Sequence, residues 1–329
     1  MLVHSGPDAA RMPPSPPRGT ALPQPSVQPA TSPSSSTASR DPGTMWPQLV
    51  LTGITMIWGV TFLVVQQALQ WIGPYTLVGA RFLLAALILA VVLRGRLRGI
   101  TAAEWRAGTL IGLGLFFGYS LQTVGLQTID SSKSAFLTAL YVPLVPLLTW
   151  VLLRRAPSLA AGAGIVMAFA GMVMLTNPGT LVFTLSPGEF YTVLGAVPIA
   201  AEILLIGHFS QHCDPRRVAF IQLLAVGVVS LATALVMGER QPEFTPGLIA
   251  SVAGLAAASA LIQFCMNWAQ RYVNATRATL IYAMEPVWAA AVGALAGERL
   301  GLWGLGGGAM IVAAVLVSTL ERRKSATNQ

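Results

Sequence analysis

Ten apolar segments, each about 20 residues long, follow one another along this chain of 329 residues and constrain its fold more than any other feature. A helix needs about 20 apolar residues to cross a bilayer, and its backbone polar groups must pair within the segment. We therefore predict an all-α membrane protein with ten transmembrane helices. They lie at about 46–69, 75–93, 105–128, 134–153, 157–176, 187–208, 217–237, 247–270, 276–296 and 301–320.

The composition agrees with this fold class. Only 10% of the residues are charged and 54% are hydrophobic, whereas a soluble domain carries about 25% charged residues. No basic stripe interleaved with aromatic residues is present, so nucleic-acid binding is not expected. Cys265 falls inside a predicted span and Cys213 in a predicted cytoplasmic loop, which argues against a disulfide framework.

The distribution of Lys and Arg predicts the orientation. If the N-terminus is cytoplasmic, sixteen of the basic residues lie inside, three (Lys133, Arg240 and Arg299) lie outside, and Arg81 lies within the second span. Cytoplasmic loops carry the excess of positive charge in membrane proteins. We therefore expect both termini in the cytoplasm and the protein in the cell (inner) membrane.

The chain also divides into two halves. A shift of 143 residues places Pro143 on Pro286 and Gln127 on Gln270 without a gap. We predict a first five-helix repeat at 45–180 and a second at 181–322, followed by a short cytoplasmic tail at 323–329. Because five is odd, the second repeat must be inverted relative to the first, as in many alternating-access carriers.

Residues 1–44 differ from the rest of the chain. Pro, Ser and Thr dominate them and no apolar run occurs, so we predict a disordered tail rather than a signal peptide. A start site assigned too early is the alternative, because Met45 immediately precedes the first span.

One predicted span carries an acid beside a helix breaker. The stretch ATLIYAMEPVWAAAVGALAGE, residues 278–298, holds Glu285 in its middle, followed directly by Pro286. The corresponding stretch 135–155 holds Pro143 without the acid. Proline interrupts a helix because it has no N–H to donate. An intramembrane carboxylate next to such a break is typical of a transport site.

Four stretches resemble one known family. They are WGVTF at 58–62, the pair Arg81-Phe82, GLQTIDSSKSAFLTALYVPLVPLL at 125–148 and MEPVWAAAVGALAGERL at 284–300. Their order and spacing resemble the ten-helix EamA type of the drug/metabolite transporter superfamily, over about residues 46–320. The resemblance implies a carrier of small organic molecules, often an exporter of amino acids or other metabolites.

Glu202 departs from that family pattern, in which an apolar or aromatic residue usually stands at this position. The related four-helix multidrug exporters carry an essential glutamate in their first helix, and Glu202 lies in the first span of the second repeat. An acid in mid-bilayer costs about 2.5–3.5 kcal/mol, so Glu202 is expected to face a central cavity. Glu202 and Glu285 could each bind a substrate amine or carry a proton, or could instead be neutral structural groups.

Further polar and aromatic residues are expected to line a cavity between the two repeats. Arg81 could bind a substrate carboxylate, pair with Glu202 or Glu285, or extend outward to the membrane surface. The remaining candidates, each of which could also be a packing residue, are Trp58, Tyr119, Gln122, Tyr141, Gln263, Asn267, Tyr282 and Trp288.

A metal site is not expected. His208, His212, Cys213 and Asp214 are clustered in sequence, but a solvated helix end explains such a cluster better than zinc.

The sequence therefore predicts a secondary-active carrier, an exporter of amino acids, related metabolites or drugs by alternating access. A proton is the candidate coupling ion, no cofactor is expected, and one chain with two repeats is expected to act as a monomer. The alternatives are a membrane-embedded enzyme, a channel and a non-transporting scaffold. The chain has no GxSxG, HExxH or metal-spaced Asp cluster for an enzyme, and a scaffold needs no midplane acids.

Overall fold

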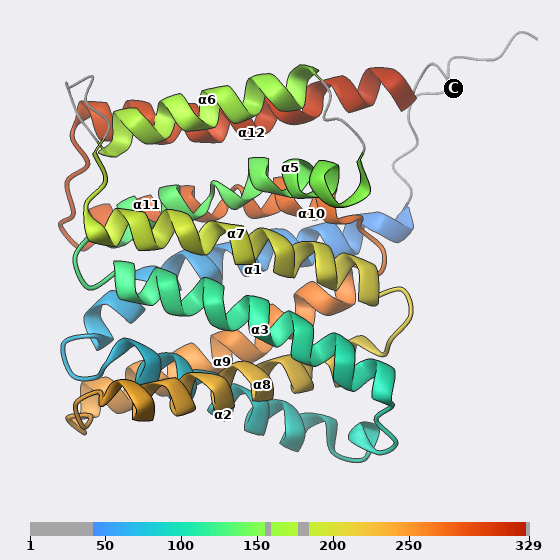
Figure 1. The fold of residues 1–329 in the computed structure, drawn as a ribbon, viewed down its shortest axis with the longest axis vertical. Helices are drawn as coiled ribbons and strands as arrows, with labels where there is room; N and C mark the ends of the chain where they lie inside the picture. Colours follow the sequence, from blue (N-terminus) through green and yellow to red (C-terminus); the bar gives the residue numbers. More distant parts are fainter. Residues whose placement is uncertain (1–41, 155–158, 177–183, 327–329) are drawn as a thin grey trace, which may run out of the picture. The chain divides into compact units, whose positions relative to one another are not determined.

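The computed structural model describes residues 42–154, 159–176 and 184–326. Nearly all of the predicted N-terminal tail, and residues 327–329 of the predicted C-terminal tail, lie outside them. The described residues form helices and no strand (Figure 1). The helices are α1 (Pro42–Ala68), α2 (Pro74–Leu93), the 3-10 helix η1 (Arg94–Leu97), α3 (Ala102–Gly125), α4 (Ser131–Thr138), α5 (Tyr141–Leu153), α6 (Leu159–Thr176), α7 (Pro187–Phe209), α8 (Pro215–Met237), α9 (Pro246–Ala269), α10 (Ala275–Tyr282), α11 (Glu285–Leu295) and α12 (Leu302–Ala326).

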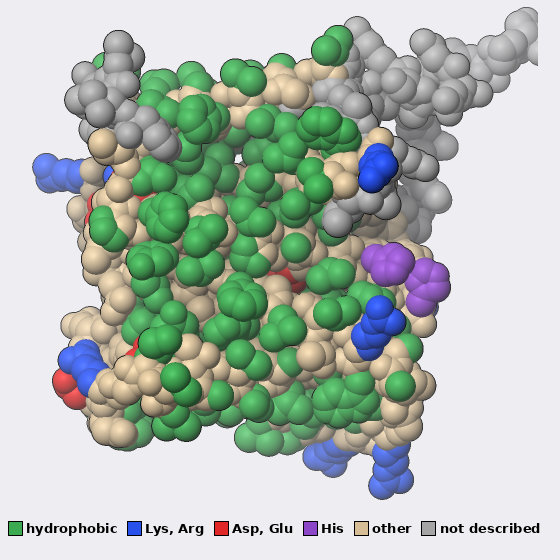
Figure 2. All heavy atoms as spheres, in the orientation of Figure 1, with side chains coloured by type: hydrophobic (Ala, Val, Ile, Leu, Met, Phe, Trp, Pro, Cys, Tyr) green, Lys and Arg blue, Asp and Glu red, His purple; other side chains and the backbone are tan. Residues whose placement is uncertain are grey.

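Eight segments of the described chain are long and apolar enough to cross a membrane. Two further apolar helical stretches, Gly162–Thr176 in α6 and Leu302–Ala314 in α12, are shorter. On the face shown in Figure 2, hydrophobic side chains cover the middle, and Lys, Arg and His side chains lie toward the edges. Such a surface suits lipid, because it leaves few polar groups to desolvate. The count of ten spans and the orientation of the termini stay predictions.

Two of the spans are interrupted in their middle. Residues 139–140 separate α4 from α5, and residues 283–284 separate α10 from α11. Pro143 is the third residue of α5 and cannot bond the carbonyl of Ala139, which instead accepts from Val142 N at 3.0 Å. Such bonds, three residues apart, tighten the helix into a 3-10 turn. Each span therefore consists of two short helices joined by a tight turn.

The helices pack in pairs across the two halves of the sequence. Helix α3 lies against α7 and α8, α2 lies against α8 and α9, and α6 lies against α12 (Figure 1). Glycines permit the closest approaches. A Cβ on Gly112 of α3 would lie 2.8 Å from the backbone oxygen of Gln222 in α8. Small residues allow helix backbones to approach in this way inside a membrane.

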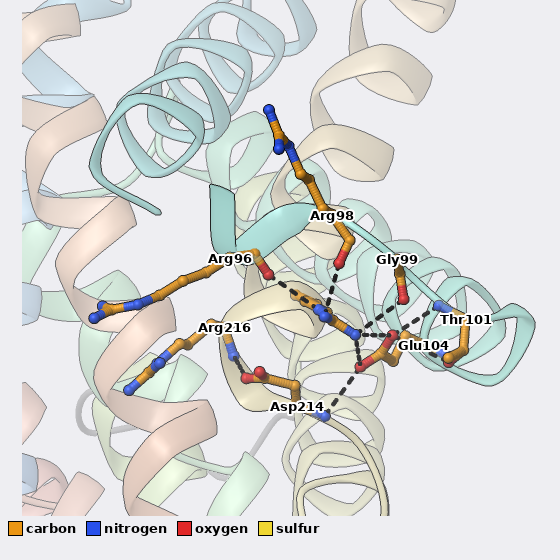
Figure 3. A network of polar contacts seen from close by, with 8 residues as sticks. Arg96, Arg98, Gly99, Thr101, Glu104, Asp214 and Arg216 are labelled. Atoms are coloured by element: carbon orange, nitrogen blue, oxygen red, sulfur yellow. Dashed lines mark hydrogen bonds and ion pairs between the residues drawn. The ribbon is translucent and has the colours of Figure 1, made fainter. Parts of the chain in front are cut away.

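A polar network joins the α2–α3 connection to the start of α8 (Figure 3). The Arg217 guanidinium donates to the carbonyl oxygens of Arg96 at 3.1 Å, Arg98 at 2.8 Å and Gly99 at 3.0 Å. It also pairs with the carboxylate of Glu104 at 3.3 Å. Glu104 completes a capping box with Thr101 at the start of α3 and accepts a bond from the backbone N–H of Asp214 at 3.3 Å. Arg217 and Glu104 thus provide hydrogen-bond partners for backbone groups of the α2–α3 connection and of the start of α8.

A second carboxylate caps a helix that is distant in the sequence. Glu239, just after α8, accepts from the backbone N–H groups of Tyr75 at 2.9 Å and Thr76 at 2.8 Å. These are orphan donors of the first turn of α2, and a carboxylate there also suits the positive end of the helix dipole.

Replacing Gly59 with alanine is expected to lower the free energy of unfolding by about 1–3 kcal/mol. A Cβ at this position of α1 would lie 2.8 Å from the backbone nitrogen of Ala289 in α11, and backbone cannot move aside as a flexible side chain can. Gly53→Ala on the same helix is the control, because a Cβ there meets nothing within 4 Å. Thermal unfolding in detergent measures both. Equal stability of the two variants would contradict the prediction.

Candidate functional site

Buried aromatic rings join the two halves of the chain at the centre of the helices. The ring of Trp58 in α1 stacks on Tyr119 of α3 at 6.4 Å between centroids and meets the edge of Tyr282 of α10 at 5.9 Å. Tyr119 also contacts Phe82 of α2 edge-on at 5.1 Å. All four side chains are buried. Aromatic residues that lie in different helices therefore form one cluster.

Glu285 lies at the first position of α11, immediately after the interruption of its span. Its Oε2 accepts a hydrogen bond of 3.1 Å from the hydroxyl of Tyr141, the first residue of α5. Its Oε1 has no hydrogen-bond partner within the described residues, and the side chain is buried. The Tyr141–Glu285 bond connects the two interrupted spans, one from each half of the chain.

Glu202 is fully buried in the middle of α7. Its Oε1 accepts from Gln263 Nε2 of α9 at 3.1 Å, whereas its Oε2 lacks a partner in the part of the chain that the structure describes. The amides continue this chain of bonds. Gln222 of α8 donates to Gln263 at 2.7 Å and accepts from Asn267 at 3.1 Å. Each acid thus keeps one oxygen available for a proton or a ligand.

Arg81 neither pairs with Glu202 or Glu285 nor extends to the membrane surface. Its Nε and Nη2 donate to Ser259 Oγ of α9 at 3.1 and 2.9 Å, and the side chain is buried. The guanidinium lies 4.7 Å from the ring centre of Phe82 and 5.2 Å from that of Tyr119, as in cation–π contacts. No ion pair with Glu202 or Glu285 occurs among the described residues.

Two of the other predicted residues, Gln122 and Tyr282, also make hydrogen bonds between helices. Gln122 of α3 donates to Thr138 of α4 at 3.1 Å. The hydroxyl of Tyr282 accepts from Gln270 at 3.2 Å. The indole nitrogens of Trp58 and Trp288 have no partner within the described chain. Sequence reasoning missed the structural partners Gln222, Ser259, Gln270 and Thr138, although each is a polar residue in or beside an apolar segment.

Two surface pockets lie away from this cluster, around the connection between α3 and α4. One has a volume of about 550 Å³ and is lined in part by Lys133 and Glu189, which form an ion pair. The other, of about 450 Å³, shares Thr128, Ile129 and Asp130 with the first. None of the predicted site residues lines either pocket. The central side chains pack against one another instead of lining these openings.

Glu298 binds the start of α4 at the same end of the helices. Its carboxylate accepts from the backbone N–H groups of Ser131 and Ser132 at 3.0 Å and from both of their hydroxyls. The N-cap residue Asp130 makes no side-chain capping bond. Burial acts to raise the pKa of the Glu298 carboxyl, but the bonds from Ser131 and Ser132 outweigh it and hold the pKa below its ordinary value. Glu298 is therefore an ionised helix cap supplied by the other half of the chain.

Glu298→Gln is expected to lower the free energy of unfolding by about 1 kcal/mol at neutral pH, the usual effect of losing a helix cap. Because the native pKa is depressed, this stabilisation is complete above the ordinary pKa of about 4.3 and is lost as the pH falls through the native pKa. The melting temperatures of the two proteins should therefore converge in acid. A difference that stays constant across that range would contradict the assignment.

His208 and His212, the histidines of the cluster at 208–214, lie next to each other at the end of α7. The two rings lie 5.8 Å apart, and Nδ1 of His212 lies 3.2 Å from the backbone oxygen of His208. Within the described residues, no group of three His, Cys, Asp or Glu side chains has metal-binding spacing.

Comparison with known proteins gives the family. A protein of Archaeoglobus fulgidus named an uncharacterized transporter is 28% identical over 245 residues, 74% of this chain and 76% of that protein. The uncharacterized inner membrane transporter YedA of Escherichia coli (strain K12) is 28% identical over 284 residues, 82% of this chain and 89% of YedA. A solved crystal structure superposes with a TM-score of 0.65 at 19% identity, over 84% of this chain and 99% of the other, and shares the fold.

The EamA-like transporter family matches twice, at residues 45–177 and 186–320. These two matches cover most of the chain, and each falls on one half of it. This multi-pass membrane protein is therefore a member of the EamA-like transporter family.

Proposed function

We propose that this protein is a secondary-active carrier that exports small organic solutes, amino acids or related metabolites and drugs among them, by alternating access. The observation that carries the proposal is the pair of buried acids, Glu202 and Glu285, each with one oxygen bonded and one oxygen without a partner among the described residues. Retaining a buried acid without full pairing costs free energy, so such groups in membrane proteins usually mark proton or substrate sites.

The Tyr141–Glu285 bond supplies a means of coupling. It crosses between the halves, whereas the Gln263–Glu202 bond lies within the second half. A hydrogen bond to an ionised carboxylate is about twice as strong as one to a neutral group. Protonation of Glu285, or its binding of a substrate amine, would therefore weaken the contact between α5 and α11 and favour movement of one half against the other.

The surrounding rings suit an organic solute. Trp58, Tyr119 and Tyr282 offer flat apolar surfaces, and Arg81 offers a buried positive charge without an ionised partner among the described side chains. These side chains pack against one another here, and once the two halves move apart such a site would accept a solute with an apolar body and a charged group. We place the two halves, 45–180 and 181–322, as inverted repeats in the inner membrane with both termini cytoplasmic, and one chain as the transporting unit.

The test uses purified full-length protein in proteoliposomes. The pH outside is recorded while amino acids, nucleosides and lipophilic cations are added in turn. We expect at least one solute to trigger a proton movement that protein-free liposomes lack. Solute uptake without proton movement would show a uniporter or an exchanger, and the proton would not be the coupling ion. If no solute moves under any imposed gradient, the carrier proposal fails.

A further inference from the structure

Helix α4 carries hydroxyl groups along one buried face. Ser131, Ser134, Thr138 and, after the turn, Tyr141 are spaced by three, four and three residues, which places them in a row along a helix. All four side chains are fully buried. Burying aliphatic side chains on a membrane helix costs less free energy than burying hydroxyls, because a buried hydroxyl needs a hydrogen-bond partner. The row therefore calls for an explanation.

Both ends of this row meet a carboxylate of the second half. At one end, the hydroxyl of Ser131 donates to Glu298 Oε1 at 2.6 Å. At the other, the hydroxyl of Tyr141 donates to Glu285 Oε2 at 3.1 Å. Glu285 begins α11 and Glu298 follows its end, so α11 runs antiparallel to α4 along the row. The row thus connects the end of the helices with the buried acid, over about 15 Å at 1.5 Å per residue.

The middle of the row has unused hydrogen-bonding capacity. Ser134 Oγ is fully buried and has no partner among the described residues, and the same holds for Glu285 Oε1. Thr138 Oγ1 accepts from Gln122 and can still donate. Between Glu285 and Glu298, the buried residues of α11 are Pro286, Ala289 and Gly293, none of which has a polar side chain. Orphaned buried hydroxyls of this kind are places where water binds.

The matching half-helix of the second half carries its hydroxyls at other positions, and they are already bonded: Thr279 donates to the backbone oxygen of Ala275, and the Tyr282 hydroxyl accepts from Gln270. Helix α10 has eight residues, as α4 has, and is followed by the same two-residue turn. At its first and fourth positions it carries Ala275 and Ala278 where α4 carries Ser131 and Ser134. Alanine methyl groups cannot relay protons. Within the described residues, the buried hydroxyl without a partner therefore occurs in α4, at Ser134, and is not repeated at the matching position of α10.

We propose that the Ser131–Ser134–Thr138–Tyr141 row is a proton path linking Glu285 to the end of the molecule that holds Glu298. Each hydroxyl both donates and accepts, and water bound at Ser134 would span the intervals of about 5–6 Å between successive side chains. A proton enters beside Glu298, each oxygen passes one proton on as it receives another, and the last step delivers one to the Glu285 carboxylate. The proposed carrier would use this path to load its acid from the side of Glu298, so the inference rests on the proposed function and deepens it.

The test follows deuterium exchange at Glu285 by infrared spectroscopy of the full-length protein in liposomes after a change from H₂O to D₂O. The band of the protonated carboxyl group that Glu285→Gln removes identifies the residue. Ser134→Ala is expected to slow the deuterium shift of this band about five- to tenfold, because one relay bond is lost. Thr138→Val should slow it similarly. Ser230→Ala is the control, because Ser230 Oγ in α8 is equally buried and without a partner in the described chain but lies outside the row.

Exchange as fast in Ser134→Ala and Thr138→Val as in the wild type would overturn the path. So would the absence of any Glu285-dependent carboxyl band across the pH range in which the protein stays folded, since a group that never carries a proton needs no path. The measurement requires no solute. If the two variants slow the exchange but no solute is transported, the proton path is supported and the carrier proposal is wrong. If solute is transported but the exchange is unchanged in the variants, the carrier proposal is supported and the proton path is wrong.

Discussion

Replacing Glu285 with glutamine is expected to lower the solute-triggered proton flux of proteoliposomes by about 100-fold or more, the usual effect of removing a group that transfers a proton. Glutamine has nearly the same shape and keeps an oxygen that can accept from the Tyr141 hydroxyl, so the fold should persist. It cannot take up a proton at the working pH. Any solute movement that remains should therefore be exchange without proton coupling.

Glu202→Gln is expected to reduce the same flux, but with a different secondary effect. The glutamine oxygen can still accept the bond from Gln263, which lies within the second half of the chain, so the change should alter solute affinity more than the movement of the halves. Glu243→Gln is the matched control, because Glu243 is an exposed acid paired with Arg240 on the surface. A proton flux that survives both Glu202→Gln and Glu285→Gln would make the two acids structural and the site assignment wrong.

Arg217→Ala is expected to lower the free energy of unfolding by about 2–4 kcal/mol, the largest stability effect that we predict for a single side chain outside the central cluster. The change removes the bonds to the carbonyls of Arg96, Arg98 and Gly99 and leaves Glu104 without its cationic partner (Figure 3). A carboxylate that stays buried without its counter-charge is costly. The start of α3 and the start of α8 should loosen together.

Arg216→Ala is the control for this prediction. Arg216 is adjacent and exposed, and only its backbone N–H bonds Asp214, so its side chain can be removed at little cost. Arg217→Lys should recover only part of the stability, because an ammonium group lacks the planar fork that reaches several carbonyls at once. Thermal unfolding in detergent micelles compares the three variants. Equal losses for Arg216→Ala and Arg217→Ala would show that the network contributes nothing beyond surface charge.

The sequence by itself determined that the chain crosses a membrane and which family it belongs to. Both conclusions depend on features that are local in sequence, namely the length of apolar runs and short ordered motifs, and the family matches at 45–177 and 186–320 agree with them. The transporter class follows from the same features. The substrate, the direction of transport and the coupling ion do not follow, because no local pattern in the chain encodes them.

The tertiary structure alone decided which polar groups meet. The sequence allowed Arg81 to pair with Glu202 or Glu285, but the structure places it on Ser259, 178 residues away. Nothing in the sequence connects Glu298, at the end of the motif 284–300, with a distant helix, yet it caps α4, 167 residues earlier in the chain. The Tyr141–Glu285 bond likewise joins residues 144 apart. Such contacts depend on how each helix is rotated and placed against its neighbours. An apolar stripe seen along one helix specifies neither quantity, because in lipid almost every face is apolar.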